Sequence, residues 1–466
     1  MLAGALAAPV TAQEQIVTLG DSLTFAYESS FNFDITIPFG PAYGDGFDSD
    51  EVKNWIEILS DPTYRNSHFD QGGRNDFTVA FLFDLFLRRD FNWAIPGAKI
   101  DELRAFYGGD QTITELIAAS DSLTALQLLL GLSDFSDNDF DLLDLKDQLG
   151  NEAERVVLFV GGNDINGVYG DVYDGLSAGT FVADFVEDAA WIIDWALGHN
   201  PDLEFVLVNV PHVGITPLVK DRYPPDPVKT GRVTAVLDDL NGQLKALAAS
   251  RGVGFADVYT PTLRLLGSDP LCVEGMGFAN TGSSSGDLDF VWLAGDLSDN
   301  FHPNTNAQAL IANEIIHAFN RHYEVAIAPL SATEILGGLL QKSPAEIDMP
   351  FADWSSCYGI PVDVDGDSDR DGLKAGLEFA LGLDPTRDDR ESVTSGLVDG
   401  STMLELAYPQ RLPASSQVTL RAMQSKDLNF APLVPQPTEG ADGLLRAKLP
   451  VTGGKGFLRL EAEVGP

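Results

Sequence analysis

The stretch Ile16-Val17-Thr18-Leu19-Gly20-Asp21-Ser22-Leu23 joins an apolar run to a glycine turn that carries a serine. A short apolar run of this kind is typical of a buried strand in a parallel sheet. Gly20 permits a sharp turn, so the hydroxyl of Ser22 is expected at the carboxyl edge of that strand, where α/β proteins gather their ligands. The alternative is an ordinary turn in which Ser22 caps a helix. The stretch therefore predicts an α/β fold with a candidate serine nucleophile.

Three further segments follow in the chain and complete the pattern. Asn92-Trp93-Ala94-Ile95-Pro96-Gly97-Ala98 runs from a short strand into a Pro-Gly turn, which exposes the backbone N–H of Gly97. Leu158-Phe159-Val160-Gly161-Gly162-Asn163-Asp164 ends in another glycine turn, which is followed by the amide of Asn163. Asp299-Asn300-Phe301-His302-Pro303 places an aspartate three residues before a histidine, just ahead of a predicted helix. Together the segments supply a nucleophile, three oxyanion donors and a base.

In this order the chain resembles the GDSL, or SGNH, hydrolase family, whose marker residues Ser, Gly, Asn and His are matched by Ser22, Gly97, Asn163 and His302. The stretch at 92–98 and the later Asn209-Val210-Pro211-His212-Val213-Gly214-Ile215-Thr216-Pro217 are similar to the bacterial and plant esterase–lipase branch. The resemblance covers the first two thirds of the chain and implies a flavodoxin-like three-layer α/β/α sandwich. It does not extend to the α/β-hydrolase fold, because no Gly-x-Ser-x-Gly elbow surrounds the serine.

These residue types favour acyl transfer to water. A serine hydroxyl needs a base to take its proton, and the neutral imidazole of His302 is suited to that role near pH 7. Asp299 is expected to accept a hydrogen bond from the other ring nitrogen and to stabilise the imidazolium. The backbone N–H groups of Ser22 and Gly97 and the amide of Asn163 are expected to hold the oxyanion. No catalytic metal or organic cofactor is expected.

Several of these positions have structural alternatives. Asp299 is preferred as the orienting acid because its spacing matches the family pattern, but it is also placed to cap the following helix, and Asp296 is a competing acid. Asn163 is also placed to brace its own turn. His212 follows a predicted strand, so substrate contact is expected there rather than catalysis. The other histidines are expected to be structural or solvated: His68, His199, His317 and His322.

Composition bounds the class of protein. The chain has 466 residues, of which 44% are hydrophobic, so it can bury a core and more than one domain. Its net charge of −41 makes nucleic acid and anionic membrane surfaces unfavourable partners. Met1–Ala12 is apolar and small-residue-rich, and it indicates the end of a secretory leader without its basic part. We therefore expect a secreted, extracellular or periplasmic protein with no transmembrane anchor, in which Cys272 and Cys357 either form one disulfide or remain two buried thiols.

The catalytic region alternates short apolar runs with amphipathic patterns. Strands of a parallel sheet are predicted at 15–19, 91–94, 156–160, 205–209 and 253–257. A helix is predicted over 305–322, with one apolar face for packing. Two long insertions, 24–90 and 99–154, are expected to shape the substrate pockets. The acidic stretch Asp134–Asp147 is expected to be a solvated loop and helix face, and a metal that supports the active site through it or through Asp45–Glu51 is the alternative.

Composition changes after Ala328, and a calcium motif is predicted beyond it. Read from Asp367, the loop places carboxylates at the spacing of an EF-hand, with Gly372 at the turn and a twelfth-position glutamate; its expected ligands are Asp367, Asp369, Asp371 and Glu378. Lys374 stands where such loops usually carry an apolar residue, so the motif resembles a lone thrombospondin type 3-like repeat of exported bacterial proteins. The alternative is a flexible acidic linker. A calcium ion here is expected to be structural.

The predicted organisation has five parts. These are a residual leader at 1–12, a catalytic domain at 13–328, a linker at 329–362, the calcium motif at 363–392 and a small β domain at 393–466. Alternating runs such as Leu404–Tyr408 and Leu458–Ala462 predict that the last part is antiparallel. The favoured function is a secreted serine hydrolase of carboxylic esters. The alternatives are an acetyl esterase acting on carbohydrate, which a glycan-contacting β domain would suit, a lysophospholipase, and a surface binding protein with an inactive core.

Overall fold

We describe a computed structural model of the chain. Its described residues are 13–25, 27, 52–64, 68–79, 83–113, 115–116, 141–283, 288–294, 299–400, 402–410, 416–426, 428–433, 436–440, 444–451 and 456–465. The predicted leader, the acidic stretch at 45–51, residues 134–140 of the stretch at 134–147, and Asp296 lie outside them. The chain forms two compact units, Met1–Val213 with Asp226–Asp257, and Gly214–Pro225 with Val258–Pro466, and each is described by itself. Ala328 lies inside the second unit, and the predicted division at that residue stays a prediction.

The first unit is built on a parallel sheet whose strands are buried. Its order is β1-β4-β5-β6, and the strands are β1 (Ile16–Gly20), β4 (Arg155–Phe159), β5 (Glu204–Val208) and β6 (Gly254–Ala256). They confirm four of the five predicted strands. The fifth prediction, at 91–94, is a segment that runs along the free side of β1 through a parallel bridge between Thr18 and Asn92. Apolar side chains on both faces explain why these strands read as continuous hydrophobic runs.

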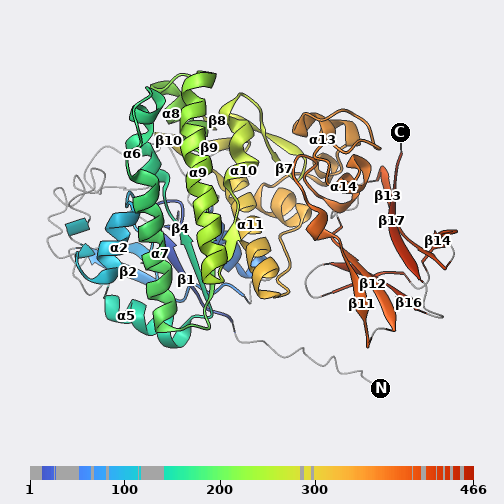
Figure 1. The fold of residues 1–466 in the computed structure, drawn as a ribbon, viewed down its shortest axis with the longest axis horizontal. Coiled ribbons are helices and arrows are strands. Elements are labelled where there is room, and N and C mark those ends of the chain that lie inside the picture. The colour runs from blue at the N-terminus through green and yellow to red at the C-terminus, as the bar shows by residue number, and fades with distance from the viewer. Residues whose placement is uncertain are drawn as a thin grey trace. The chain divides into compact units, whose positions relative to one another are not determined.

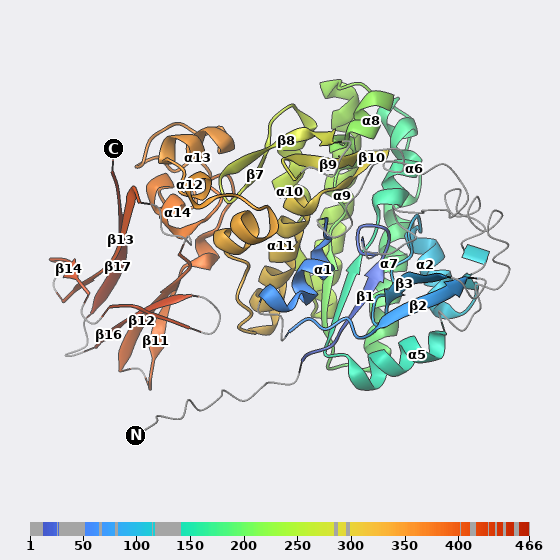
Figure 2. The ribbon, with the colours of Figure 1, turned by 180° about the vertical axis from the view of Figure 1, so that it is seen from behind.

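Helices cover both faces of this sheet. Three long helices lie side by side on one face in Figure 1, and α1 is seen on the other in Figure 2. The helices are α1 (Trp55–Ser60), α2 (Ile100–Gly108), α5 (Leu142–Asp147), α6 (Gly162–Tyr173), α7 (Phe181–His199) and α9 (Pro227–Arg251), and a hairpin of β2 (Arg74–Val79) and β3 (Phe83–Arg89) is appended. The longest, α9, starts at Asp226, whose side chain accepts from two backbone N–H groups, and ends at Gly252 in the left-handed conformation. The layers confirm the predicted α/β fold.

The second unit contains another sheet, which the sequence did not reveal. Its order is β10-β9-β8-β7, and the strands are β7 (Leu271–Val273), β8 (Met276–Ser283), β9 (Phe290–Ala294) and β10 (Asp299–Pro303). Six helices belong to this unit: α8 (Pro217–Arg222), α10 (Tyr259–Thr262), α11 (Thr305–Tyr323), α12 (Pro344–Ile347), α13 (Phe351–Tyr358) and α14 (Ala375–Leu381). The helix predicted over 305–322 is confirmed as α11, and it packs on β7, β9 and β10. Asp299 and His302 thus lie in a strand rather than in a loop before that helix.

The end of the chain is antiparallel β structure, as the alternating runs predicted. One sheet has the order β11-β12-β16-β15 and the other β14-β13-β17. Their strands are β11 (Thr394–Val398), β12 (Met403–Tyr408), β13 (Val418–Ser425), β14 (Ala431–Pro432), β15 (Thr438–Glu439), β16 (Leu445–Pro450) and β17 (Phe457–Val464). Leu381 of α14 belongs to the buried cluster formed by these strands, so the helix of the predicted calcium motif is anchored on them.

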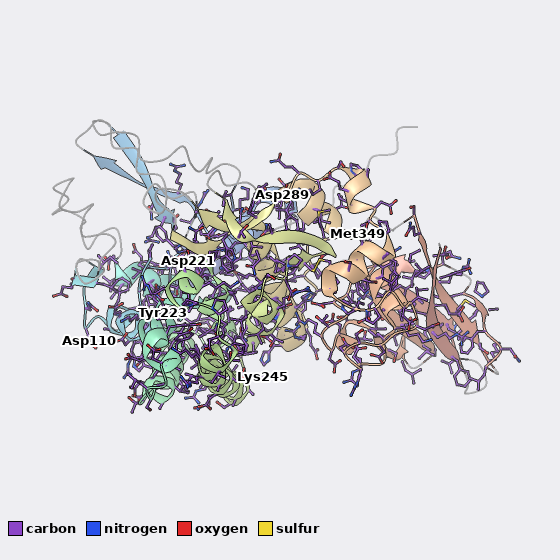
Figure 3. The ribbon with its side chains drawn as sticks, turned by 90° about the horizontal axis from the view of Figure 1, so that it is seen from above. Asp110, Asp221, Tyr223, Lys245, Asp289 and Met349 are labelled. Atoms are coloured by element: carbon purple, nitrogen blue, oxygen red, sulfur yellow. A yellow bond between two sulfur atoms is a disulfide. The ribbon has the colours of Figure 1, made fainter. Side chains whose placement is uncertain are left out.

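A disulfide joins Cys272 of β7 to Cys357 of α13, with the two Cα atoms 6.0 Å apart. It closes a loop of 85 residues, and in the chain-entropy model a crosslink of that span stabilises the fold by roughly 4 kcal/mol. Next to it, Met349, labelled in Figure 3, packs with Trp354 and Phe379 in a buried cluster that connects α13 to α14. Among the described residues, no helix combines the length and apolar character needed to cross a membrane.

Candidate active site

Three turns of the first unit meet at the carboxyl edge of its sheet. Strands β1 and β4 are parallel and in register from Ile16 with Arg155 to Gly20 with Phe159. On the other side of β1, the N–H of Trp93 donates to the carbonyl of Thr18 (2.8 Å), and the N–H of Ile95 donates to that of Gly20 (2.9 Å). Because parallel segments end at a common edge, the turns after them, which carry Ser22, Gly97 and Asn163, lie at one edge of the sheet.

Glycines are required at this edge because backbones approach each other closely. A Cβ atom at Gly20 would overlap the carbonyl oxygen of Phe159. One at Gly161, whose φ is 127°, would lie 2.6 Å from a methyl group of Val210. Gly97 has a φ of 80°, in the left-handed region that the Pro-Gly turn needs. The glycines that flank the candidate residues are therefore fixed by the geometry of the turns.

Ser22 lies in a tight helical turn directly after β1. The N–H groups of Thr24 and Phe25 both donate to the carbonyl of Asp21 (3.0 Å each), so the turn begins immediately before the serine. Ser22 itself is 7% exposed, which leaves its hydroxyl nearly enclosed at the strand end. The sequence predicted a strand-to-helix turn here; the structure shows a turn directly after β1, and the first helix among the described residues is α1.

The carboxylate of Asp21 connects the serine turn to the turn after β4. One of its oxygens accepts from the N–H of Leu23 (3.0 Å), and the other accepts from the N–H of Gly161 (3.3 Å). The side chain is buried, so these charge-assisted bonds are protected from water. Asp21 therefore holds the nucleophile turn against the turn that leads to Asn163. We did not predict this role, although the signal was a polar residue immediately after a buried strand.

Asn163 and Asp164 connect the third turn to the Gly97 turn. The side-chain N–H of Asn163 donates to the carbonyl of Ala98 (3.1 Å), which uses one of the two hydrogens of its amide. The carboxyl of Asp164 accepts from the N–H of Ile100 (3.2 and 3.3 Å to its two oxygens). Burial raises the pKa of Asp164 to about 8, and the negative charge of Asp21 adds to the rise. The bond to Ala98 means that the Asn163 amide braces its own turn, which was the structural alternative for this residue. The NH₂ group has a second hydrogen in addition to the one used in this bond.

Asp299 and His302 both belong to β10 in the second unit. Asp299 is opposite Ala294 of β9, Pro303 is opposite Trp292, and the register shifts between these pairs. His302 is half-buried and meets the ring of Phe301 edge-on at 5.7 Å between centroids. Directly after it, Asn304 caps α11 through the N–H of Thr305 (2.7 Å) and donates to the carbonyl of Phe290 (3.1 Å). The strand and the capped helix thus hold the backbone of His302 from both sides.

His212 does not support the expected contact with substrate. Its ring is fully buried, its Nε2 lies 3.3 Å from the hydroxyl of Thr234, and it meets Tyr169 edge-on. Burial lowers the pKa of His212 to about 4, so the ring is neutral at pH 7. A ring with no exposed surface presents nothing to a ligand, and it acts as a packed, polar part of the core.

The predicted metal ligands gather in the C-terminal part of the second unit. One oxygen from each of Asp367, Asp369 and Asp371 lies within 4.8 Å of the others. Glu378, in α14, is fully buried beside them, and burial together with the charges of Asp369 and Asp371 raises its pKa to about 8. Oxygen donors of this kind suit a hard divalent cation.

Comparison with known proteins shows the family of the chain. Residues 16–315 match the family described as GDSL-like Lipase/Acylhydrolase. No match was found among curated proteins. Solved structures with a similar fold include an acetylxylan esterase from Geobacillus stearothermophilus (11% identity, TM-score 0.32, covering 66% of this chain and 94% of that one). They also include phospholipase A1 from Streptomyces albidoflavus (14%, 0.32, 66% and 100%) and an extracellular lipase from Streptomyces rimosus (16%, 0.30, 66% and 99%).

The matched region contains every turn described above together with β10. It spans more than half of the chain, from the first residue of β1 to the middle of α11. The protein therefore belongs to the GDSL-like lipase/acylhydrolase family and is a carboxylic ester hydrolase.

Proposed function

We propose that the protein is an exported serine hydrolase of carboxylic esters in which Ser22 is the nucleophile, His302 the base and Asp299 the acid that orients it. The observation that carries the proposal is the edge of the β1–β4 sheet, where Asp21 joins the turn of Ser22 to that of Gly161. Membership of the hydrolase family and the position of His302 on a braced strand support it.

The proposed reaction has two steps, acylation of Ser22 and hydrolysis of the acyl-enzyme. The hydroxyl of Ser22 loses its proton to the imidazole of His302 as its oxygen attacks the ester carbonyl. The resulting oxyanion accepts hydrogen bonds from the N–H groups of Ser22 and Gly97 and from the amide of Asn163. Collapse of this intermediate releases the alcohol, which takes the proton from His302. Water then attacks the acyl-enzyme by the same route and releases the acid.

Experiments are needed to identify which class of ester is the substrate. An acetyl group on a polysaccharide would need a short acyl pocket, and the β strands from 394 to 464 would then be the part to contact glycan. A lysophospholipid would instead need a long apolar acyl pocket. Export is supported by the disulfide between Cys272 and Cys357, because such bonds persist in oxidising compartments. A surface binding protein with an inactive core is the alternative of another class.

The test of the proposal compares Ser22→Ala with Ser177→Ala. Ser177 is an exposed serine in a loop of the same unit, so its loss controls for a general effect of removing a hydroxyl. Ser22→Ala should reduce kcat/KM on a nitrophenyl ester by roughly 10⁴-fold and abolish labelling by a fluorophosphonate, with the circular dichroism spectrum unchanged. Ser177→Ala should change neither. Full turnover by a folded Ser22→Ala protein would refute the mechanism.

Substrate class is resolved by a panel on the wild-type protein. Nitrophenyl esters of increasing acyl length are compared with acetylated xylan and a lysophospholipid at equal enzyme concentration. A preference of about 100-fold for acetyl over octanoyl esters, together with release of acetate from xylan, would favour the carbohydrate esterase. The reverse preference would favour the lipase or lysophospholipase. Inactivity on every member would favour the binding protein.

A further inference from the structure

The acidic loop before α14 is folded in a way that leaves carboxylate oxygens facing one another. Its turns are made by the carboxylates themselves: Asp367 accepts from the N–H of Gly372 (3.2 Å) and Asp369 accepts from that of Asp371 (3.1 Å). Each of these bonds uses one oxygen of its carboxylate. Asp367, Asp369 and Asp371 place one oxygen each within 4.8 Å of the others, so their negative charges repel one another. We name Asp367, Asp369, Asp371 and Glu378 the carboxylate cluster.

Glu378 provides an independent sign that a cation belongs in the cluster. It is fully buried, and among the described residues neither of its carboxylate oxygens has a hydrogen-bond partner. The second oxygen of Asp369 is likewise buried and unpaired within the described part of the chain. Burial raises the pKa of Glu378, and the negative charges of Asp369 and Asp371 add to the rise, so these carboxylates are near neighbours of Glu378. A buried carboxylate without donors is strongly destabilising unless a cation compensates it.

The cluster is connected to α11 by a short chain of polar contacts. The second oxygen of Asp371 accepts from the N–H of Asp389 (3.0 Å), and Asp389 in turn accepts from the N–H of Asp384 (3.0 Å). In the turn between these two residues, Arg387 donates to both carboxylate oxygens of Glu314 (2.5 and 3.3 Å). Glu314 lies in the middle of α11, the helix that begins three residues after His302.

We propose that the carboxylate cluster binds one Ca²⁺ ion and that the bound ion holds the turn at 384–389 in the position from which Arg387 secures α11. Four carboxylates and no histidine or cysteine form a hard oxygen donor set, which suits Ca²⁺ better than Zn²⁺. The bound ion would thus support α11, the helix that follows His302 in the chain. This inference goes beyond the proposed function, and its first tests do not use hydrolysis.

Metal binding is measured by calorimetric titration of the calcium-free, full-length protein with Ca²⁺. The wild type should bind one equivalent, with at least about 10-fold preference over Mg²⁺. Glu378→Gln should weaken the affinity by about 100-fold or more, because it removes a charged and potentially bidentate ligand. Asp365→Asn is the matched control: Asp365 lies in the same loop but is exposed and paired with Lys374, so the affinity should change less than about 3-fold. Absence of binding by the wild type, or equal affinities in both variants, would overturn the site.

The link to α11 is measured by hydrogen exchange with and without Ca²⁺. In the wild type, Ca²⁺ should slow exchange of the backbone amides of both α14 and α11 by about 10-fold or more. Arg387→Gln should keep the calcium affinity and the protection of α14 but remove the calcium-dependent protection of α11. Wild-type α11 amides that do not respond to Ca²⁺ would overturn the link while leaving the metal site intact. Inactivity towards esters, by contrast, would bear on the proposed function alone.

Discussion

Asp21 and Glu378 are both buried carboxylates, Asp21 in the turn after β1 and Glu378 in α14, but their oxygens have opposite hydrogen-bonding environments. Asp21 accepts hydrogen bonds from the backbone N–H groups of Leu23 and Gly161, whereas the oxygens of Glu378 meet no donor among the described residues. A buried carboxylate that accepts hydrogen bonds from nearby N–H groups stabilises the turns that carry those groups. A buried carboxylate without donors needs a cation to compensate its charge, so it is a candidate metal ligand. The contrast shows that burial of a charge alone does not identify a ligand site, and that the bonding of its oxygens does.

After the loss expected for Ser22→Ala, the next largest effect in the first region is expected at Asn163. Asn163→Ala should lower kcat by about 100- to 1000-fold, equivalent to roughly 3 to 4 kcal/mol, with a smaller change in KM, because the amide acts mainly on the developing oxyanion. Stability measured by urea unfolding should fall by about 1 kcal/mol through loss of the bond to Ala98. A rise in KM at constant kcat would instead make Asn163 a binding residue.

A second test asks whether Asp21 is the brace that its bonds indicate. Asp21→Asn leaves one of the two N–H groups without its acceptor and should destabilise the protein by about 1 to 3 kcal/mol in urea unfolding. It should also lower kcat, because the turn of Ser22 loses its connection to Gly161. Asp110→Asn removes an exposed carboxylate of the same unit and should change neither quantity. Equal stability of the Asp21 and Asp110 variants would show that Asp21 does not stabilise the two turns.

Glu378 should respond with the opposite sign when calcium is absent. In EDTA at pH 9, above the raised pKa of Glu378, Glu378→Gln replaces an uncompensated buried charge by a neutral group, so it should stabilise the protein by about 1 to 2 kcal/mol. In excess Ca²⁺ the same substitution should make it less stable than the wild type. Thermal unfolding in the two buffers measures both signs. A variant that is destabilised in both buffers would show that Glu378 is a brace like Asp21, and the comparison would fail.

Only part of this contrast could be predicted from the sequence. The apolar runs at β1, β4, β5 and β6 identified the parallel sheet because strands buried on both faces are continuous in character. The sheet of β7 to β10 escaped notice because β8 and β10 contain polar residues and because register shifts interrupt the pairing of β9 with both of them, so no period of two is visible. The spacing of Asp367 to Glu378 predicted a metal site, but the bonds of Asp21 and the contact of Arg387 with Glu314 join residues far apart in the chain and leave no local pattern.

The smallest effect concerns His212, a buried group that is satisfied only in its neutral form. Its pKa is lowered to about 4 in the folded protein from an ordinary value of 6.5, so the unfolded chain binds more protons between these values. Stability should therefore be lost as the pH falls below 6.5, by roughly 1 kcal/mol at pH 5.5. His212→Asn should remove this part of the loss, measured by urea unfolding at the two pH values. An unchanged slope in the variant would assign the acid sensitivity to other groups.

Because the first unit is interrupted in sequence, parts of the second unit are synthesised at different times. Gly214–Pro225 interrupts the first unit, yet it belongs with residues that begin at Val258, and its helix α8 packs against β10. The ribosome therefore releases α8 about 80 residues before its partner strand, and every oxyanion group before the base. Under the proposed mechanism, a nascent chain carries its nucleophile long before it carries the histidine that activates it. Hydrolytic competence would then be the last property that the growing protein acquires.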